Sequence, residues 1–197
     1  MVNIGVLGLQ GDVAKHLEIL SSLSVDVTVV KNKSDLASVS GLIIPGGEST
    51  TLSLLLDAQG LFVDLMGLLA GKDFPVFGTC AGMVLLANSL LDAKSGQKTL
   101  GAIDIVVRRN AFGAQISSFE EDLMIDAIGA DPIHAVFIRA PYVVSVGNKV
   151  EVLGSVEQDG VKHPVICREG KIMVTSFHPE LVRDSRLHEL WLRECVG

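Results

Sequence analysis

Short apolar runs alternate with helical patterns along the first half of the chain. Four such runs show no clear alternation with polar residues: Ile4–Leu9, Val25–Val30, Leu42–Ile44 and Val174–Phe177. Runs of this kind are typical of strands that are covered on both faces of a sheet. Helical patterns lie over Val13–Leu23, Thr51–Leu56, Leu61–Leu69 and Met83–Leu91. Because they fall between the first strands, parallel crossover connections are expected there.

Strand-like segments dominate from Gly101 to Ser176 and predict antiparallel additions to the sheet. The 197 residues contain no linker, repeat or low-complexity tract and are enough for one well-buried domain. The sequence therefore predicts an α/β fold over residues 1–197: a single-domain three-layer sandwich with a mostly parallel central sheet.

Composition and charge narrow the class of partner. Apolar residues make up 48% of the chain, the net charge is −7, and the basic residues are scattered. This pattern argues against nucleic acid or an anionic membrane surface as the main partner, so we expect a small substrate. No apolar run reaches the roughly 18 residues that a membrane span needs, and the N-terminus lacks the pattern of a signal peptide. We expect a cytoplasmic protein.

The cysteines bear on the cellular compartment, and the motifs that are missing bear on metals and cofactors. Three cysteines, an odd number without metal-type spacing, fit a reducing compartment. Cys167, in the apolar run Val165–Cys167, and Cys195, near the end of a terminal helix, are interpreted as structural. The sequence shows no zinc-ligand cluster, dinucleotide fingerprint or phosphate-binding loop. We therefore expect no metal site and no cofactor.

The segment Gly78-Thr79-Cys80-Ala81-Gly82 has the outline of a nucleophile elbow. It follows the apolar run Pro75–Phe77 and precedes a helical pattern, so Cys80 would occupy a sharp strand-to-helix turn. Small residues on either side let strand and helix approach closely. A thiol at a helix N-terminus is favoured as the thiolate. The alternative is one more buried, inert cysteine.

A possible base and its orienting acid follow the strand-like run Ile172–Phe177, in His178-Pro179-Glu180. A cysteine nucleophile needs a base within hydrogen-bond reach, and the base needs a third group that fixes its orientation. In an extended segment His178 and Glu180 would point the same way. Alone, the tripeptide also fits an ordinary proline turn. The other histidines lack such an acid and are assigned surface or packing roles: His16, His134, His163 and His188.

A glycine turn forms the third element, in Gly41–Thr51. A buried strand ends in Gly46 and Gly47 and is followed by a helix start with Ser and Thr as capping residues. The exposed backbone N–H at this turn can serve as an oxyanion-hole donor opposite the amide of Ala81. A tight, capped strand–helix turn without a ligand is the alternative.

These elements together resemble the triad-type glutamine amidotransferases. More specific strings resemble one subfamily, the glutaminase subunits of pyridoxal 5′-phosphate synthases. These strings span nearly the whole chain: Leu7-Gly-Leu-Gln-Gly11, Pro45-Gly-Gly-Glu-Ser-Thr50, Arg109-Asn-Ala-Phe-Gly-Ala-Gln115, Phe137-Ile-Arg-Ala-Pro141 and Ser176-Phe-His-Pro-Glu180. The stretch Asp92–Thr99 and the C-terminus after Glu180 carry no recognisable motif.

The resemblance implies a glutaminase that converts L-glutamine to L-glutamate and ammonia through a cysteine thioester. Its triad would be Cys80, His178 and Glu180, and the oxyanion-hole amides would be those of Gly47 and Ala81. The α-amino and α-carboxylate groups of glutamine would lie near Gly47, Glu48, Ser49, Arg109, Ile138 and Arg139. Spacing leaves open which of Arg108, Arg109 and Arg139 contacts the carboxylate.

Ammonia released into water is protonated and lost, so such a glutaminase requires an acceptor enzyme. The resemblance implies a synthase subunit with a (β/α)8 barrel that makes pyridoxal 5′-phosphate. We expect Gln10, Asp12 and His16, just past the first strand, to lie at the docking face.

Three other functions share parts of this pattern. A glutaminase that serves a different acceptor synthase would share the triad but lack the subfamily strings. A γ-glutamyl hydrolase or cysteine peptidase of similar fold would need no partner. A non-enzymatic regulatory homologue would usually have lost Cys80, His178 or Glu180.

Overall fold

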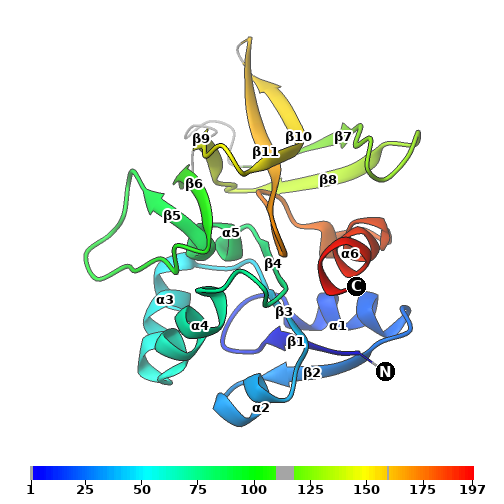
Figure 1. Cartoon of the computed structure of the whole chain (residues 1–197). Helices are drawn as coiled ribbons and strands as arrows, with labels where there is room; N and C mark the ends of the chain where they lie inside the picture. Colours follow the sequence, from blue (N-terminus) through cyan, green and yellow to red (C-terminus); the bar gives the residue numbers. More distant parts are fainter. Residues whose placement is uncertain (1, 110–117, 159) are drawn as a thin grey trace.

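A mixed sheet forms the centre of the molecule. The computed structural model describes residues 2–109, 118–158 and 160–197 (Figure 1). Four parallel pairings and two antiparallel ones join the strands. The sheet is therefore mostly parallel with antiparallel additions, as predicted. Its strands follow the order β10 (Glu151–Gln158), β11 (Val161–Glu169), β12 (Ile172–Thr175), β4 (Val76–Thr79), β3 (Gly41–Ile44), β1 (Asn3–Leu7) and β2 (Asp26–Val30).

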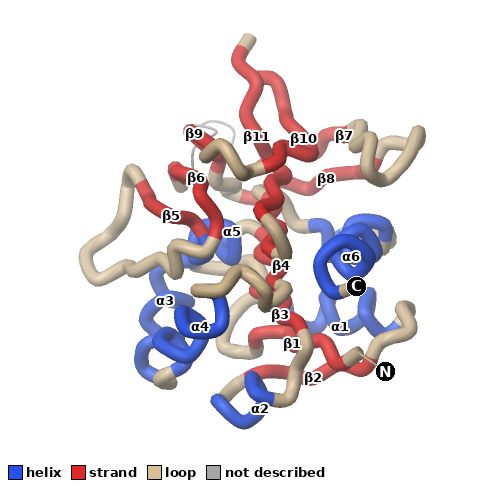
Figure 2. The backbone as a smooth tube through the Cα atoms, in the orientation of Figure 1, coloured by secondary structure: helices blue, strands red, loops and turns tan. Residues whose placement is uncertain are grey.

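Helices cover both faces of this sheet, which gives three layers (Figure 2). One face carries α2 (Lys33–Ala37), α3 (Ser49–Ala58), α4 (Leu61–Leu69) and α5 (Ala81–Leu86), and the other carries α1 (Val13–Ser21) and α6 (Arg186–Trp191). In β3, Leu42 and Ile44 join the apolar cluster on the first face and Ile43 joins the cluster on the second. Apolar residues at every position of the strand are thus explained by burial on both sides.

Two smaller sheets confirm that strands dominate the second half of the chain. One contains β5 (Ala87–Leu90), β6 (Ile103–Arg108) and β9 (Tyr142–Val146), and the other pairs β7 (Ser118–Leu123) with β8 (Ile133–Ile138). The predicted helix over Met83–Leu91 is wrong in its second half. Helix α5 ends at Leu86, Ala87 takes an extended ψ of 151°, and the following residues pair with β6. Pairing between strands overrides the local apolar pattern here.

Other helix boundaries agree with the sequence to different degrees. Helix α4 has the predicted bounds, α1 ends two residues early at Ser21, and α3 is longer than predicted. Helix α2 was not predicted. It begins after Asn32, whose side chain accepts a hydrogen bond from the backbone N–H of Asp35 at 3.1 Å. A helix this short has little periodicity to detect.

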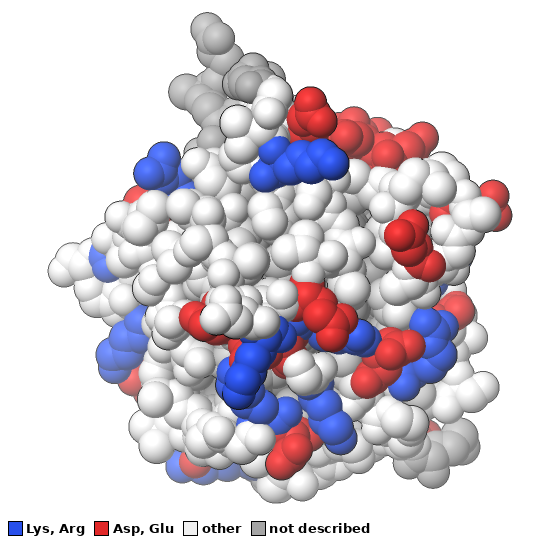
Figure 3. All heavy atoms as spheres, turned by 45° about the horizontal axis from the view of Figure 1, so that its top comes forward, with Lys and Arg blue, Asp and Glu red and all other residues white. Residues whose placement is uncertain are grey.

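Charges of both signs are mixed over the face shown in Figure 3, with acidic side chains gathered at its upper right. Among the described residues no single helix is long and apolar enough to cross a membrane. Helices α3 and α4 pass such a test only as a pair, bent by 101°.

Candidate active site

Cys80 lies in a sharp turn between β4 and α5, at the carboxyl end of the central strands. Its φ of 48° is in the left-handed region, which is unusual for a residue with a side chain. Its backbone N–H donates to the carbonyl of Thr175 at 2.8 Å, which fixes the turn against β12. The elbow geometry that the sequence predicted is therefore present, with strained backbone of the kind that functional sites hold.

Two glycines allow this turn. A Cβ added at Gly78 would lie 2.7 Å from the backbone carbon of Gly82, and a Cβ at Gly82 would lie 2.2 Å from the carbonyl oxygen of Ile44. Strand and helix thus approach closer than any side chain permits. This is the steric reason for small residues on either side of Cys80.

His178 and Glu180 face each other beside the elbow. His178 Nδ1 lies 2.8 Å from Glu180 Oε1, and Glu180 is 2% exposed. The prediction of an extended segment is wrong, because Pro179–Leu181 forms a 3₁₀ turn and His178 precedes it. Proline at the first position favours the turn, and the turn still brings the two side chains together. The bond to Nδ1 leaves Nε2 of His178 for Cys80.

The charges of its two neighbours control the protonation of His178. Burial acts to lower the pKa of His178, but hydrogen bonds with Cys80 and Glu180, and the negative charge of both, raise it to about 10. An imidazolium at His178 is therefore favoured at neutral pH. Burial raises the pKa of Cys167 to about 12 and that of Cys195 to about 11, so both stay protonated.

The glycine turn after β3 closes the site from below. A Cβ at Gly46 would lie 2.3 Å from His178 Cε1 and 3.3 Å from Cys80 Cβ, so any side chain there would displace His178. Gly47 has a φ of 142°. The backbone N–H of Ala81, the first residue of α5, has no partner within the helix.

The cap of α3 differs from the prediction. Glu48, and not Ser or Thr, is the N-cap, and its carboxylate accepts from the N–H groups of Thr50 and Thr51 at 3.2 and 2.7 Å. Burial acts to raise the pKa of Glu48, but hydrogen bonds from Thr51 and Thr50 lower it to about 2. The charge is present at neutral pH, and a carboxylate at this end of a helix is favoured by the helix dipole.

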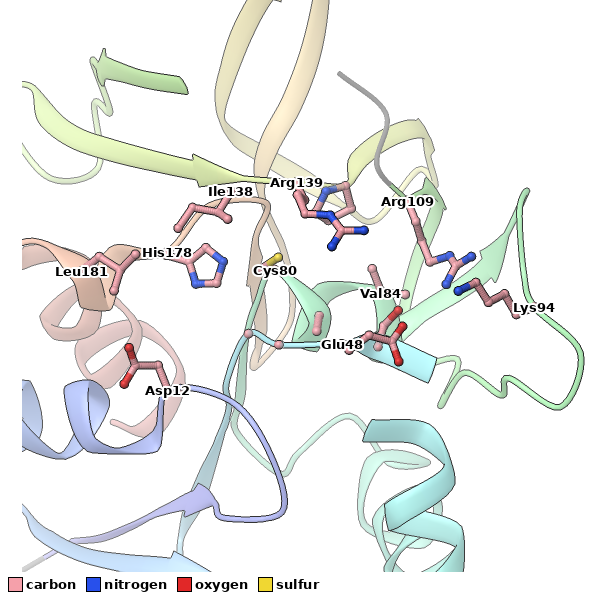
Figure 4. A pocket seen from close by; sticks show the side chains of 15 residues that line it. Asp12, Glu48, Cys80, Val84, Lys94, Arg109, Ile138, Arg139, His178 and Leu181 are labelled. Atoms are coloured by element: carbon pink, nitrogen blue, oxygen red, sulfur yellow. The ribbon is translucent and has the colours of Figure 1, made fainter. Parts of the chain in front are cut away.

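A pocket of about 490 Å³ opens above Cys80 (Figure 4). It brings together residues from the turn after β3, from α5, from β8 and from the turn after β12 that are far apart in the sequence. Its lining includes Asp12, Gly47, Glu48, Ser49, Cys80, Ala81, Lys94, Arg109, Ile138, Arg139 and His178. Glu180 is not in the lining but lies behind His178. The geometry combines a thiol, a paired imidazole and backbone donors in one hollow, an arrangement suited to acyl transfer.

Comparison with known proteins agrees with this geometry. Residues 6–197 match the model of the SNO glutamine amidotransferase family. The chain belongs to this family. A protein from Streptomyces avermitilis named pyridoxal 5′-phosphate synthase subunit PdxT is 50% identical over 189 residues, which are 96% of this chain and 92% of that protein. A protein of the same name from Kosmotoga olearia is 46% identical over 196 residues, covering 100% and 99% of the two chains.

A solved structure described as a glutamine amidotransferase has a TM-score of 0.89 and 40% identity, and the match covers 98% of this chain and 99% of that one. The resemblance inferred from the motifs is thus confirmed at the level of the family, and the predicted fold class is confirmed with it.

In the present chain, two of the three candidate arginines, Arg109 and Arg139, line the pocket, whereas Arg108 does not. Arg139 has a φ of 47°, again unusual for a residue with a side chain, and follows directly after β8. Ile138, also in the lining, is 40% exposed. The remainder of the string that begins at Arg109, residues 110–115, lies outside the described residues.

Asp92, in the stretch Asp92–Thr99 that carries no recognisable motif, holds Arg109 in place. Asp92 accepts from the backbone N–H of Arg109 at 3.0 Å, and its carbonyl accepts from Nη2 at 2.9 Å. Thr50 Oγ1 accepts from Nη1 at 3.2 Å, and Gln97 Nε2 donates to Ser49 Oγ at 3.0 Å. Sequence reasoning missed this segment because its role depends on contacts that span the fold.

The three residues expected at a docking face take different places. Asp12 lines the pocket, and the side chain of Gln10 lies against Gly47, about 3.2 Å from where a Cβ of Gly47 would be. His16 is fully buried. The expectation that His16 lies at a docking face is therefore wrong, because α1 turns it inward, toward Glu180 and His188.

The remaining predictions concern single residues. His188 is buried, and His134 lies within β8, where it contacts Asp122 at 2.7 Å and Glu120 at 2.9 Å. Cys167 and Cys195 are free and buried, as expected for structural cysteines. Over residues 2–109, 118–158 and 160–197 no group of three or more His, Cys, Asp or Glu side chains could hold a metal ion.

Proposed function

We propose that residues 1–197 act as a single glutaminase domain, the glutaminase subunit of a pyridoxal 5′-phosphate synthase, which hydrolyses L-glutamine to L-glutamate and ammonia. The observation that carries the proposal is Cys80 in a strained elbow beside the His178–Glu180 pair. Relatives that are 46% to 50% identical over nearly the whole chain bear the name of this subunit. The family match and the site thus support the same reaction.

The geometry supports the following reaction. The Cys80 thiolate attacks the side-chain amide carbon of glutamine while His178 is protonated, and the oxygen takes the negative charge. His178 then gives its proton to the leaving nitrogen, the C–N bond breaks, and ammonia departs from a γ-glutamyl thioester. Water, deprotonated by His178, hydrolyses the thioester and frees Cys80. Glu180 orients His178 and stabilises its imidazolium form.

We assign the oxyanion hole to the backbone N–H groups of Gly47 and Ala81. They belong to the two turns that meet under Cys80, and each donor of this kind typically contributes about 3–4 kcal/mol to the transition state. Gln10 packs against Gly47, so the position of this side chain bears on the conformation of the turn.

We assign the binding of the glutamine α-groups to pocket residues on the side away from His178. Arg109 or Arg139 would hold the α-carboxylate through a two-pronged contact. The Glu48 carboxylate keeps its negative charge while it caps α3, so it can offset the α-ammonium without leaving the cap. Gly47 and Ser49 complete this wall, and Ile138 contributes to the binding site from beside His178 (Figure 4).

We further propose that the partner is a synthase subunit with a (β/α)8 barrel, and that Gln10 and Asp12 lie at the docking face. Both residues border the turn that holds the proposed oxyanion hole, so docking there can reach the catalytic geometry. The chain would need no metal and no cofactor of its own. Its three free cysteines fit a cytoplasmic location.

The test is glutamate release from glutamine by this chain alone and with the synthase subunit added. We expect strong stimulation by the synthase and loss of activity in Cys80→Ala. The matched control, Cys195→Ala, removes a buried thiol far from the pocket and should keep the activity. Release that survives Cys80→Ala would refute the assignment, and release that ignores the synthase would point to another acceptor.

A further inference from the structure

A pair of buried histidines lies directly behind the proposed triad. His16 comes from α1 and His188 from α6, and both are fully buried. His16 Nδ1 lies 3.0 Å from His188 Nε2. Neither residue takes part in the reaction described above. Burying two imidazoles in the core of a protein costs free energy unless their nitrogens are hydrogen-bonded, because each ring removes polar nitrogens from water.

The second nitrogen of His16 points at the proposed triad. His16 Nε2 lies 3.5 Å from Glu180 Oε2 and 3.4 Å from Thr79 Oγ1. Glu180 Oε1 is already held by His178, whereas Oε2 is buried and has no hydrogen-bond partner among the described residues. A buried carboxylate oxygen requires a donor, and His16 presents a ring nitrogen 3.5 Å from it.

Both histidines are neutral in this environment. Burial lowers the pKa of His16 well below its usual range, and repulsion from any positive charge on His188 or His178 acts in the same direction. Burial lowers the pKa of His188 to about 4, although the charge of Asp184 opposes the change. Each ring therefore carries one N–H, and the two N–H groups have two possible arrangements.

The surroundings favour one of these arrangements. In the first, His188 donates from Nε2 to His16 Nδ1, and His16 carries its proton on Nε2, facing Glu180. In the second, His16 donates from Nδ1, so its bare Nε2 faces the carboxylate. The second also places the proton of His188 on Nδ1, which is buried and has no hydrogen-bond partner in the part of the chain that the structure describes. An unpartnered buried N–H and two facing lone pairs are both unfavourable, so the first arrangement is preferred.

We propose that His16 is a positioning residue for Glu180. His188 holds His16 in the tautomer with the proton on Nε2, and this N–H fixes Glu180 Oε2 so that Oε1 stays on His178. The relay then runs from His188 through His16 and Glu180 to His178. This inference rests on the proposed function of the triad, but its first test does not require turnover.

The first test is nitrogen NMR of the full chain at neutral pH. The chemical shifts of His16 should show a proton on Nε2 and a bare Nδ1, and those of His188 should show a proton on Nε2. A proton on Nδ1 of His16, or a doubly protonated ring, would overturn the proposal. Because the unmodified protein is used, folding of a variant does not enter.

The second test compares two substitutions of equal size at the same place. His16→Gln keeps an N–H near the position of Nε2, whereas His16→Met removes it. We expect His16→Met to lower the pKa of His178, measured by NMR titration, and to lower kcat by roughly 10- to 100-fold. His16→Gln should restore most of both values while KM stays unchanged in both variants.

Equal pKa and kcat values for the two variants would contradict a positioning role. If the proposed triad were wrong, turnover would survive Cys80→Ala. The tautomer of His16 and the titration of His178 would still test, independently of that result, whether His16 positions Glu180. The two hypotheses are thus separable.

Discussion

Gly46 controls how closely His178 can approach Cys80. An alanine Cβ at position 46 would lie 2.3 Å from His178 Cε1 and 2.9 Å from its Nδ1, whereas ordinary contacts begin at 3.4 Å. The imidazole would therefore have to move by about 1 Å, and a displacement of that size in a reacting group reduces catalysis by about 100-fold. The backbone of Gly46 is not in the left-handed region, so the added methyl group is the only perturbation.

The assay is synthase-stimulated glutamate release by Gly46→Ala, together with its thermal unfolding. We expect kcat to fall by about 100-fold with little loss of stability, because a side chain at the pocket edge can move aside. The matched control is Gly67→Ala in α4, where a Cβ meets nothing within 4 Å. It should keep full activity and raise stability by about 1 kcal/mol. A folded Gly46→Ala enzyme with activity within twofold of the unmodified chain would refute the reasoning.

Three further substitutions test other parts of the site. Gly82→Ala places a Cβ 2.2 Å from the carbonyl oxygen of Ile44, and chemical denaturation should show a loss of about 1–3 kcal/mol; unchanged stability would mean that the elbow tolerates side chains. Asp92→Ala removes the carboxylate that accepts from the backbone N–H of Arg109 and forms an ion pair with its Nε at 3.7 Å, and should raise KM for glutamine more than it lowers kcat; steady-state kinetics with a changed kcat alone would contradict this. Glu48→Ala should lose about 1 kcal/mol at pH 7. Because the folded-state pKa of Glu48 is lowered to about 2 from 4.5, that stabilisation is present above pH 4.5 and is lost as the pH falls through 2; a difference that persists below pH 2 would count against it.

The elbow was predictable because its requirements are local. A sharp turn between strand and helix needs small residues beside the nucleophile, and Gly78 and Gly82 provide them within five positions of the chain. The His178–Glu180 pair was found for the same reason, although the backbone between them is a 3₁₀ turn and not an extended segment. Either conformation places the two side chains within reach, so the pairing was right although the predicted backbone was wrong.

Features that depend on distant contacts were not predictable. Asp92 looks like any loop residue until the fold places it against Arg109, 17 positions away. His16 follows the polar break after the first strand, which suggested a docking face, but α6, near the other end of the chain, brings His188 against it. The end of α5 at Leu86 likewise depends on the pairing of β5 with β6. In each case a tertiary contact determines the local structure, and a single sequence does not reveal which residues make that contact.

The most direct test of the central claim is to trap the acyl-enzyme. The complex with the synthase would be mixed with glutamine, quenched in acid within a turnover, digested, and searched for a glutamyl group by mass spectrometry. Our account predicts the group on the peptide that contains Cys80, and no group on those that contain Cys167 or Cys195. Rapid turnover with no adduct, or an adduct on another residue, would contradict it.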